Sequence, residues 1–241
     1  MSRFYHQMRD VVLGHSAIHN PYLDWFRTGD VSDPELRHFA IEFYNFTRFF
    51  PKILVSQLVN TEDELIADEL TRVLYSELGE GSPHHRHELL YRKFLRSIGI
   101  DIHQALTQPM MPSTKAYIDG MEALYGSGNH AQALGASFGL ENMAITMWDH
   151  LIPGLVALQQ SSHPNMDTTY FTFHRELEST HEEAMEKAVA AMEEQATGSK
   201  NLSPEEGQDF HQGVTMVLDY LEGFWMGLEK QRSTPHQAGV V

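Results

Sequence analysis

The stretch His174-Arg-Glu-Leu-Glu178-Ser-Thr-His181 carries the spacing on which our interpretation of this chain depends. In an α-helix of about 3.6 residues per turn, positions 174, 178 and 181 lie one above another on a single face. They would present two imidazoles and a carboxylate to one side of a helix that we expect over residues 165–195. Because the chain contains 15 histidines, the same spacing also arises by chance, and the alternative interpretation is a solvated helix face.

Helical periodicity continues on both sides of this stretch. Apolar residues recur at spacings of three and four, and strand-like alternation is scarce, which predicts an all-α bundle of seven to eight helices. Breaking residues place the helices at about 2–29 (two short helices broken near Asn20-Pro21), 34–60, 62–78, after the turn at 79–83 to 97, 113–125, 130–160, 165–195 and 204–231. We expect residues 100–112 to form a loop, residues 1–241 to form a single domain, and residues 232–241 to be a flexible tail.

The amino-acid composition limits the possible metal ligands and binding partners. The absence of cysteine excludes disulfides, thiolate-ligated zinc, iron–sulfur clusters and a cysteine nucleophile, so that imidazole and carboxylate remain as metal ligands. The net charge of −16 argues against nucleic acid and anionic membranes as partners. We expect a cytoplasmic protein, because no apolar run is long enough to span a membrane and the first residues do not resemble a signal peptide.

Two further features would complete a metal site. Glu77 ends one expected helix and His87 begins the next, across the turn Gly79-Glu-Gly-Ser-Pro83, so a tight helical hairpin can bring both side chains to one point. Glu141 lies in the least polar helix, where a buried carboxylate is costly unless it is protonated, paired with a cation or bound to a metal. The alternatives are a solvated turn and a carboxylate that is hydrogen-bonded in the core or exposed at an edge.

Four helical segments thus supply three glutamates and three histidines. These are Glu77, His87, Glu141, His174, Glu178 and His181. Two-iron proteins use such a set, because each iron takes oxygen and nitrogen ligands inside a helical bundle and keeps positions open for oxygen and substrate. The small residues around Glu141 predict that its helix packs closely against a neighbour. They are Gly135, Ala136, Gly139 and Ala144.

The most specific segment is Glu77-Leu-Gly-Glu-Gly-Ser-Pro-His-His-Arg-His87-Glu-Leu-Leu-Tyr-Arg-Lys-Phe94-Leu95-Arg-Ser-Ile-Gly99. It resembles the haem-oxygenase-like di-iron oxidases, relatives of the chlamydial protein CADD and, more distantly, of PqqC and TenA. The resemblance covers about residues 35–230. A glutamate, a glycine-containing turn, a histidine ten residues on and a leucine/phenylalanine pattern ending in glycine are common in that family.

The resemblance implies a haem-oxygenase-like fold and a site that binds two irons and reacts with dioxygen. It assigns the family's central-helix glutamate to Glu141 and its final motif to His174, Glu178 and His181. Glu178 stands where aspartate is usual, so its carboxylate has an arm longer by one methylene. The family's activities include N-oxygenation of amines, oxidative C–C cleavage of amino acids, decarboxylation of fatty acids and nitrile formation, and fold and ligands do not select among them.

The helix at 34–60 carries the candidate substrate contacts, because its many aromatic residues predict an apolar, flat-walled cavity. These candidates are Glu42, Asn45, Phe46, Arg48 and Phe49. Glu42 could receive a substrate ammonium group and Arg48 a carboxylate. The alternative is that the aromatic residues form core and the polar residues lie on the surface.

Two rival functions use the same fold. His15 or His19 could be the proximal ligand of a haem, although haem would not explain Glu141. The chain could also be a non-catalytic helical binding protein whose metal site is vestigial. The candidate partners are a small-molecule substrate, such as an amino acid with an apolar or aromatic side chain, an external electron donor, and a second copy of the chain in a homodimer.

Overall fold

The computed structural model describes residues 2–197 and 202–233, and all regular structure in these residues is helical, as the sequence predicts. The helices are α1 (Arg3–Leu13), α2 (Pro21–Arg27), α3 (Asp33–Asn60), α4 (Glu64–Glu77), α5 (His87–Ser97), α6 (Ile102–Thr107), α7 (Pro112–Tyr125), α8 (His130–Ser161), α9 (Thr169–Thr197) and α10 (Pro204–Ser233), with a 3₁₀ turn at Pro83–His85. Of the expected tail at 232–241, Arg232 and Ser233 belong to α10, and the remaining residues lie outside the described part.

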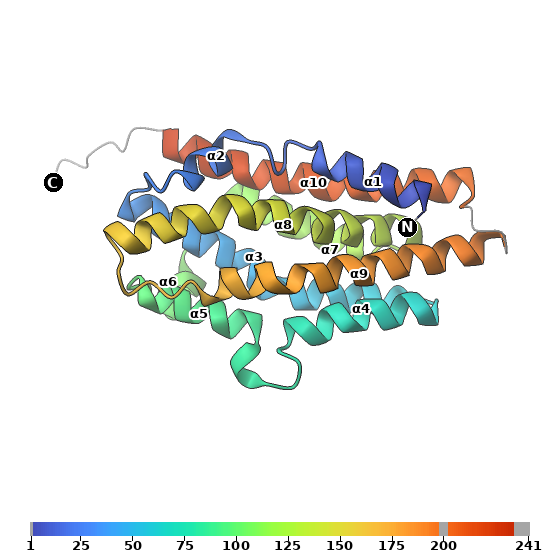
Figure 1. Ribbon diagram of the computed structural model, residues 1–241, viewed down its shortest axis with the longest axis horizontal. Helices are drawn as coiled ribbons and strands as arrows, with labels where there is room; N and C mark the ends of the chain where they lie inside the picture. Colours follow the sequence, from blue (N-terminus) through green and yellow to red (C-terminus); the bar gives the residue numbers. More distant parts are fainter. Residues whose placement is uncertain (1, 198–201, 234–241) are drawn as a thin grey trace.

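The long helices run side by side along the bundle (Figure 1). The apolar α8 packs against α10 and α9, α4 packs against α9, and α7 packs against α10 and α3, while the short α1 and α2 cover α8 and α10. One continuous core of aromatic and aliphatic side chains fills the space between them. Because α8 lies between α9 and α10, the middle of this helix is buried, and Glu141 is buried with it.

Glycine permits a close approach between α8 and α10. A Cβ atom added to Gly135 would lie 2.1 Å from the carbonyl oxygen of Phe210, and one added to Gly213 would lie 2.0 Å from that of Gln132. The two backbones therefore touch where only glycine fits. This confirms that the small residues of α8 mark a close helix contact.

Local capping explains where the helices begin. The Ser203 side chain accepts a hydrogen bond from the backbone of Glu206, while the Glu206 carboxylate accepts one from the Ser203 backbone N–H, which forms a capping box before Pro204. Asp63 caps α4 and Asn129 caps α8 more simply, because each side chain accepts one hydrogen bond from a backbone N–H of the first turn. The expected start of the last helix at residue 204 is confirmed.

The expected loop at 100–112 is wrong in part, because it contains α6. The Asp101 side chain accepts a hydrogen bond from the N–H of His103 and so caps this helix, while Ala105 is fully buried. A helix of six residues spans fewer than two turns, too short for a periodic apolar pattern to show in the sequence. Together with α1 and α2, this short helix raises the number of α-helices in the described residues to ten.

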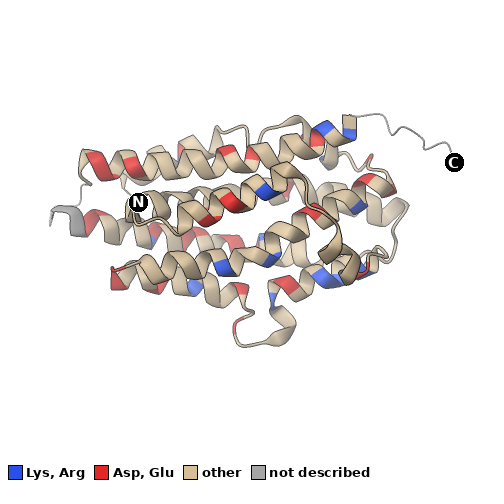
Figure 2. Ribbon diagram, turned by 180° about the vertical axis from the view of Figure 1, so that it is seen from behind, with Lys and Arg blue, Asp and Glu red and all other residues tan. Residues whose placement is uncertain are grey.

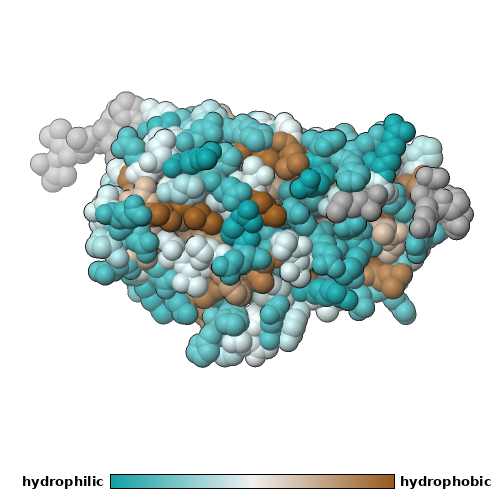
Figure 3. Space-filling view, viewed as in Figure 1, coloured by the Kyte–Doolittle hydropathy of each residue, from teal (hydrophilic) through white to brown (hydrophobic). Residues whose placement is uncertain are grey.

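The surface of the bundle carries charged side chains on all sides. Acidic residues outnumber basic ones, and they are spread over several helices (Figure 2). On the face shown in Figure 3, hydrophobic residues form small separate patches among hydrophilic ones. Among the described residues, no helix combines the length and the apolar character that crossing a membrane requires.

Candidate metal centre

The structure brings the six metal-binding candidates together as two groups of three in the middle of the bundle. Glu77, His87 and His174 form the first triad, and Glu141, Glu178 and His181 form the second, with ligand atoms in each triad within 4.8 Å of one another. All six side chains are buried. A third group, made of His15, Asp219 and Glu222, lies at the surface and is partly exposed.

In the first triad, the nitrogen and oxygen atoms lie close together but do not form hydrogen bonds with one another. Nδ1 of His87 lies 2.9 Å from Oε2 of Glu77, yet neither ring nitrogen of His87 has a partner in hydrogen-bonding geometry. Nδ1 of His174 lies 2.7 Å from the carbonyl oxygen of Tyr170. Since that carbonyl can only accept, Nδ1 carries the proton and Nε2 presents a lone pair to the triad, 4.0 Å from Oε1 of Glu77.

The turn between α4 and α5 sets the distance from Glu77 to His87. Gly79, Glu80 and Gly81 all have positive φ angles, which reverses the chain within a few residues. At Gly79 a Cβ atom would lie 2.4 Å from the carbonyl oxygen of Ser82, so this position requires glycine. The structure confirms that this turn brings Glu77 and His87 together, but the expected helical hairpin is wrong, because α5 continues along the bundle beyond the end of α4 and does not fold back against it (Figure 1).

In the second triad, two carboxylates share one imidazole. Nδ1 of His181 lies 3.1 Å from Oε2 of Glu141 and 3.7 Å from Oε2 of Glu178. The indole N–H of Trp148 donates a hydrogen bond of 2.7 Å to Oε1 of Glu178. Oε2 of Glu178 and Nε2 of His181 remain buried without hydrogen-bond partners.

The two triads differ in their protonation. Burial and the neighbouring His87 lower the pKa of His174 to about 3, so its ring is neutral, as a metal ligand must be. Burial works against a proton on His181, but the charges of Glu141 and Glu178 outweigh it and raise its pKa to about 9. Burial also raises the pKa of Glu178. Without a metal, the second triad therefore holds at least one proton at neutral pH.

The residues present fit a pair of iron ions. Three carboxylates and three imidazoles are the oxygen and nitrogen donors that iron takes in helical bundles. Among the described residues that line this region there is no lysine or arginine to offset the carboxylates. The unpartnered atoms of His87, Glu178 and His181 are costly in the interior unless a cation binds them.

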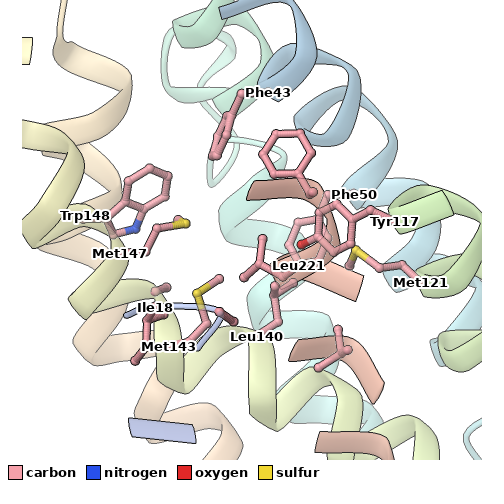
Figure 4. Packing of buried hydrophobic residues seen from close by; sticks show 14 of the residues in the cluster. Ile18, Phe43, Phe50, Tyr117, Met121, Leu140, Met143, Met147, Trp148 and Leu221 are labelled. Atoms are coloured by element: carbon pink, nitrogen blue, oxygen red, sulfur yellow. The ribbon is translucent and has the colours of Figure 1, made fainter. Parts of the chain in front are cut away.

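An apolar cavity adjoins both triads. It has a volume of about 50 Å³, and its walls come from α3, α4, α8 and α9. Besides Glu77, Glu141, His174, Glu178 and His181, the lining residues are Phe46, Thr47, Phe50, Leu140, Met143, Ala144, Met147, Trp148 and Tyr170. Figure 4 shows Met143, Met147 and Trp148 on one side of this space, with Phe50 on the other side. The cavity has room for a few water molecules, so a larger molecule must displace side chains.

The candidate substrate contacts on α3 take different positions. Phe46 lines the cavity. Glu42 is buried away from its lining and accepts hydrogen bonds from the Met111 backbone and the Thr114 hydroxyl. Asn45 accepts a hydrogen bond from the side chain of Arg48, whose guanidinium lies over the ring of Phe49. Of the five, only Phe46 contributes to the lining, and a role of the others in substrate binding stays a prediction.

Several functional positions were not expected from the sequence. Trp148 contacts Glu178 as well as the cavity, and it stands two helical turns after Glu141 on the same face of α8. That spacing is the signal that could have found it, and Met147 and Ala144 follow the same face. The haem-ligand candidates lie elsewhere: Nε2 of His19 is 2.8 Å from the Leu13 carbonyl oxygen, and that of His15 is 3.3 Å from Asp219.

Comparisons with known proteins agree with this geometry. A family model described as an iron-containing redox enzyme, of the haem-oxygenase-like type, matches residues 37–222, and the chain belongs to this family. The 4-chloro-allylglycine synthase of Streptantibioticus cattleyicolor is 26% identical over 219 residues, which cover 91% of this chain and 80% of that protein.

Solved structures support the fold. A CADD-like protein of unknown function from Nostoc punctiforme superposes with a TM-score of 0.78 at 16% identity, covering 96% of this chain and 97% of its own. A TenA homologue from Pseudomonas syringae has a TM-score of 0.73 at 13% identity, and the match covers 89% of this chain and 86% of that protein. The haem-oxygenase-like fold and the resemblance to the CADD and TenA proteins are thereby confirmed.

Proposed function

We propose that this chain is a non-haem di-iron enzyme that uses dioxygen to oxidise a small metabolite bearing an amine or a carboxylate. The observation that carries this proposal is the pair of buried triads on the wall of one apolar cavity. Membership of an iron-containing redox family supports the metal. The six ligands of the proposed site are Glu77, His87, Glu141, His174, Glu178 and His181.

Bound iron would supply the redox chemistry, the reduction of dioxygen coupled to oxidation of the substrate. The residues of the chain hold the ligands in place and control protons. Tyr170 fixes the ring of His174 through its carbonyl, and Trp148 holds one oxygen of Glu178, so both ligands keep their orientation. Glu141 and His181 share a proton that is released when a metal takes their lone pairs. The apolar lining keeps bulk water from the reacting atoms.

An amino acid with an apolar or aromatic side chain is the substrate class we propose. The apolar cavity wall would accept such a side chain, while metal ions bind amine or carboxylate groups directly. The name of 4-chloro-allylglycine synthase denotes an enzyme that makes a modified amino acid, which supports the same class here. N-oxygenation, oxidative C–C cleavage and nitrile formation are the candidate outcomes, and an outcome that consumes extra electrons needs an external donor.

The proposal is tested by loading the protein with ferrous iron without oxygen, exposing it to air, and following oxygen uptake and the visible spectrum. We expect two irons per chain, oxygen uptake and no Soret band. His174→Ala and Glu141→Ala should each lose iron and oxygen uptake, whereas His84→Ala, at an exposed position of the same turn region, should keep both. Full iron content and oxygen uptake in the first two variants, or a Soret band after haem addition in place of iron binding, would contradict the proposal.

A further inference from the structure

The side chain of Tyr117 ends in the interior without a hydrogen-bond partner. Its ring is 1% exposed, and its hydroxyl group is buried with no donor or acceptor in hydrogen-bonding geometry. Buried hydroxyl groups nearly always have a partner, because an unpaired one loses its hydrogen bonds to water and gains none in return. An orphaned hydroxyl in a native core therefore needs an explanation.

Tyr117 is not a lining residue of the cavity, and it lies behind the part of the wall that Phe46 contributes. The ring of Tyr117 packs against Phe46, a residue of the cavity wall, with 5.0 Å between centroids, and against Phe224 at 5.8 Å. Figure 4 shows its hydroxyl end turned inward toward Leu221 and Leu140. Burial raises the pKa of Tyr117, and the charge of Glu141, a residue of the second triad, contributes to this rise.

The cavity must grow to admit a substrate, and on the side of Tyr117 its wall includes Phe46, which is only partly buried. Met143 and Met147 line the other side of the cavity, and their movement also enlarges the space that a substrate can occupy. Methionine side chains are unbranched and change shape at low cost. The wall also includes metal-binding candidates such as Glu178 and His174, which hydrogen bonds hold in place.

We propose that the Tyr117 hydroxyl binds a polar group at the end of the substrate remote from the metal triads. This inference rests on the proposed function and narrows its substrate class to a largely apolar chain that carries a metal-binding amine or carboxylate at one end and an uncharged hydrogen-bonding group at the other. A charged remote group is excluded, since a neutral hydroxyl between Phe46 and Phe224 cannot offset a full charge in an apolar surrounding.

The variant Tyr117→Phe removes only the oxygen atom. If the hydroxyl serves substrate binding, thermal stability should stay the same or rise, since no hydrogen bond of the protein is lost. Tyr91→Phe is the matched control, because Tyr91 is equally buried but donates a hydrogen bond of 3.0 Å to the carbonyl oxygen of Ala40. This control should lower the melting temperature and leave ligand preference unchanged. A structural role for the Tyr117 hydroxyl would instead lower the melting temperature of both variants.

Ligand preference is measured with amino acids of equal shape that differ only in a terminal hydroxyl or methyl group. The pairs are L-homoserine against L-norvaline, and 5-hydroxy-L-norvaline against L-norleucine. Titration calorimetry on iron-loaded protein without oxygen gives the dissociation constants. We expect the hydroxylated member of at least one pair to bind more tightly, and Tyr117→Phe to reduce that preference by about fivefold.

The result that overturns the inference is equal binding within both pairs, or a preference that Tyr117→Phe leaves intact. Iron content, measured colorimetrically on the same samples, separates this failure from that of the proposed function. Protein that fails to bind two irons contradicts the di-iron proposal, whereas fully loaded protein with an unchanged preference contradicts the role of Tyr117 alone.

Discussion

Replacing Gly79 by alanine should disable the first triad without touching any of its ligands. Gly79 has a φ of +88°, and an added Cβ would lie 2.4 Å from the Ser82 oxygen, 2.6 Å from the Arg86 nitrogen and 2.9 Å from the carbonyl carbon of His85. All three are backbone atoms, so no side-chain rotation can relieve the contact. The turn has to open, and His87 would move away from Glu77 with it.

The expected loss of unfolding free energy in Gly79→Ala is the sum of two contributions. The left-handed conformation costs a residue with a Cβ about 1 kcal/mol, and overpacking against fixed atoms costs about 2 kcal/mol more. Gly81→Ala is the matched control in the same turn. It has a φ of +79°, but the nearest atom is the Tyr75 hydroxyl at 3.3 Å, the end of an exposed side chain that can move. The control should therefore lose only the conformational contribution of about 1 kcal/mol.

Urea unfolding and iron titration of both variants give the test. We expect Gly79→Ala to lose about 3 kcal/mol of unfolding free energy and to bind one iron per chain where the unaltered protein binds two. Gly81→Ala should keep both irons. If Gly79→Ala binds two irons and is no less stable than Gly81→Ala, the turn does not position His87 and the argument for the first triad is refuted.

Three further predictions concern the second triad and the helix contact. Trp148→Phe removes the hydrogen bond to Glu178 and should weaken the binding of one iron by about tenfold, as measured in competition with a chelator. Unchanged iron affinity would show that Trp148 does not orient Glu178 for metal binding. The pKa of His181 is raised to about 9, so the metal must displace its proton. Iron affinity, measured by titration, should therefore rise by about tenfold per pH unit between pH 6 and 8. An affinity that does not change with pH would show that no proton is displaced. Gly135→Ala should lower the melting temperature sharply, whereas Gly223→Ala, with open space around it, should not, as thermal unfolding would show.

The sequence predicts much of this site, because its ligands follow local rules. Spacing within one helix aligns His174, Glu178 and His181, and one glycine turn joins Glu77 to His87. The apolar surroundings of Glu141 show in the sequence because its neighbours in the helix, apart from Asn142, are small or apolar. Helix boundaries are equally local, since caps and prolines mark them.

Contacts between distant residues could not be predicted in this way. The sequence suggests Glu42 as a substrate contact, but it does not show that the hydroxyl of Thr114, 72 positions further along the chain, donates a hydrogen bond to the Glu42 carboxylate. The partner of the Trp148 indole is 30 positions away, and its role depends on how α8 and α9 pack. Whether a hydroxyl such as that of Tyr117 is orphaned depends on every helix around it, so only the three-dimensional structure shows it.

Anomalous X-ray diffraction from crystals of the iron-loaded protein, recorded on both sides of the iron absorption edge, tests the central claim most directly. We predict two iron peaks per chain, one bound by Glu77, His87 and His174, and the other bound by Glu141, Glu178 and His181. A single peak would contradict the two-iron site. Iron found only at the partly exposed group of surface residues, His15, Asp219 and Glu222, would contradict the whole assignment.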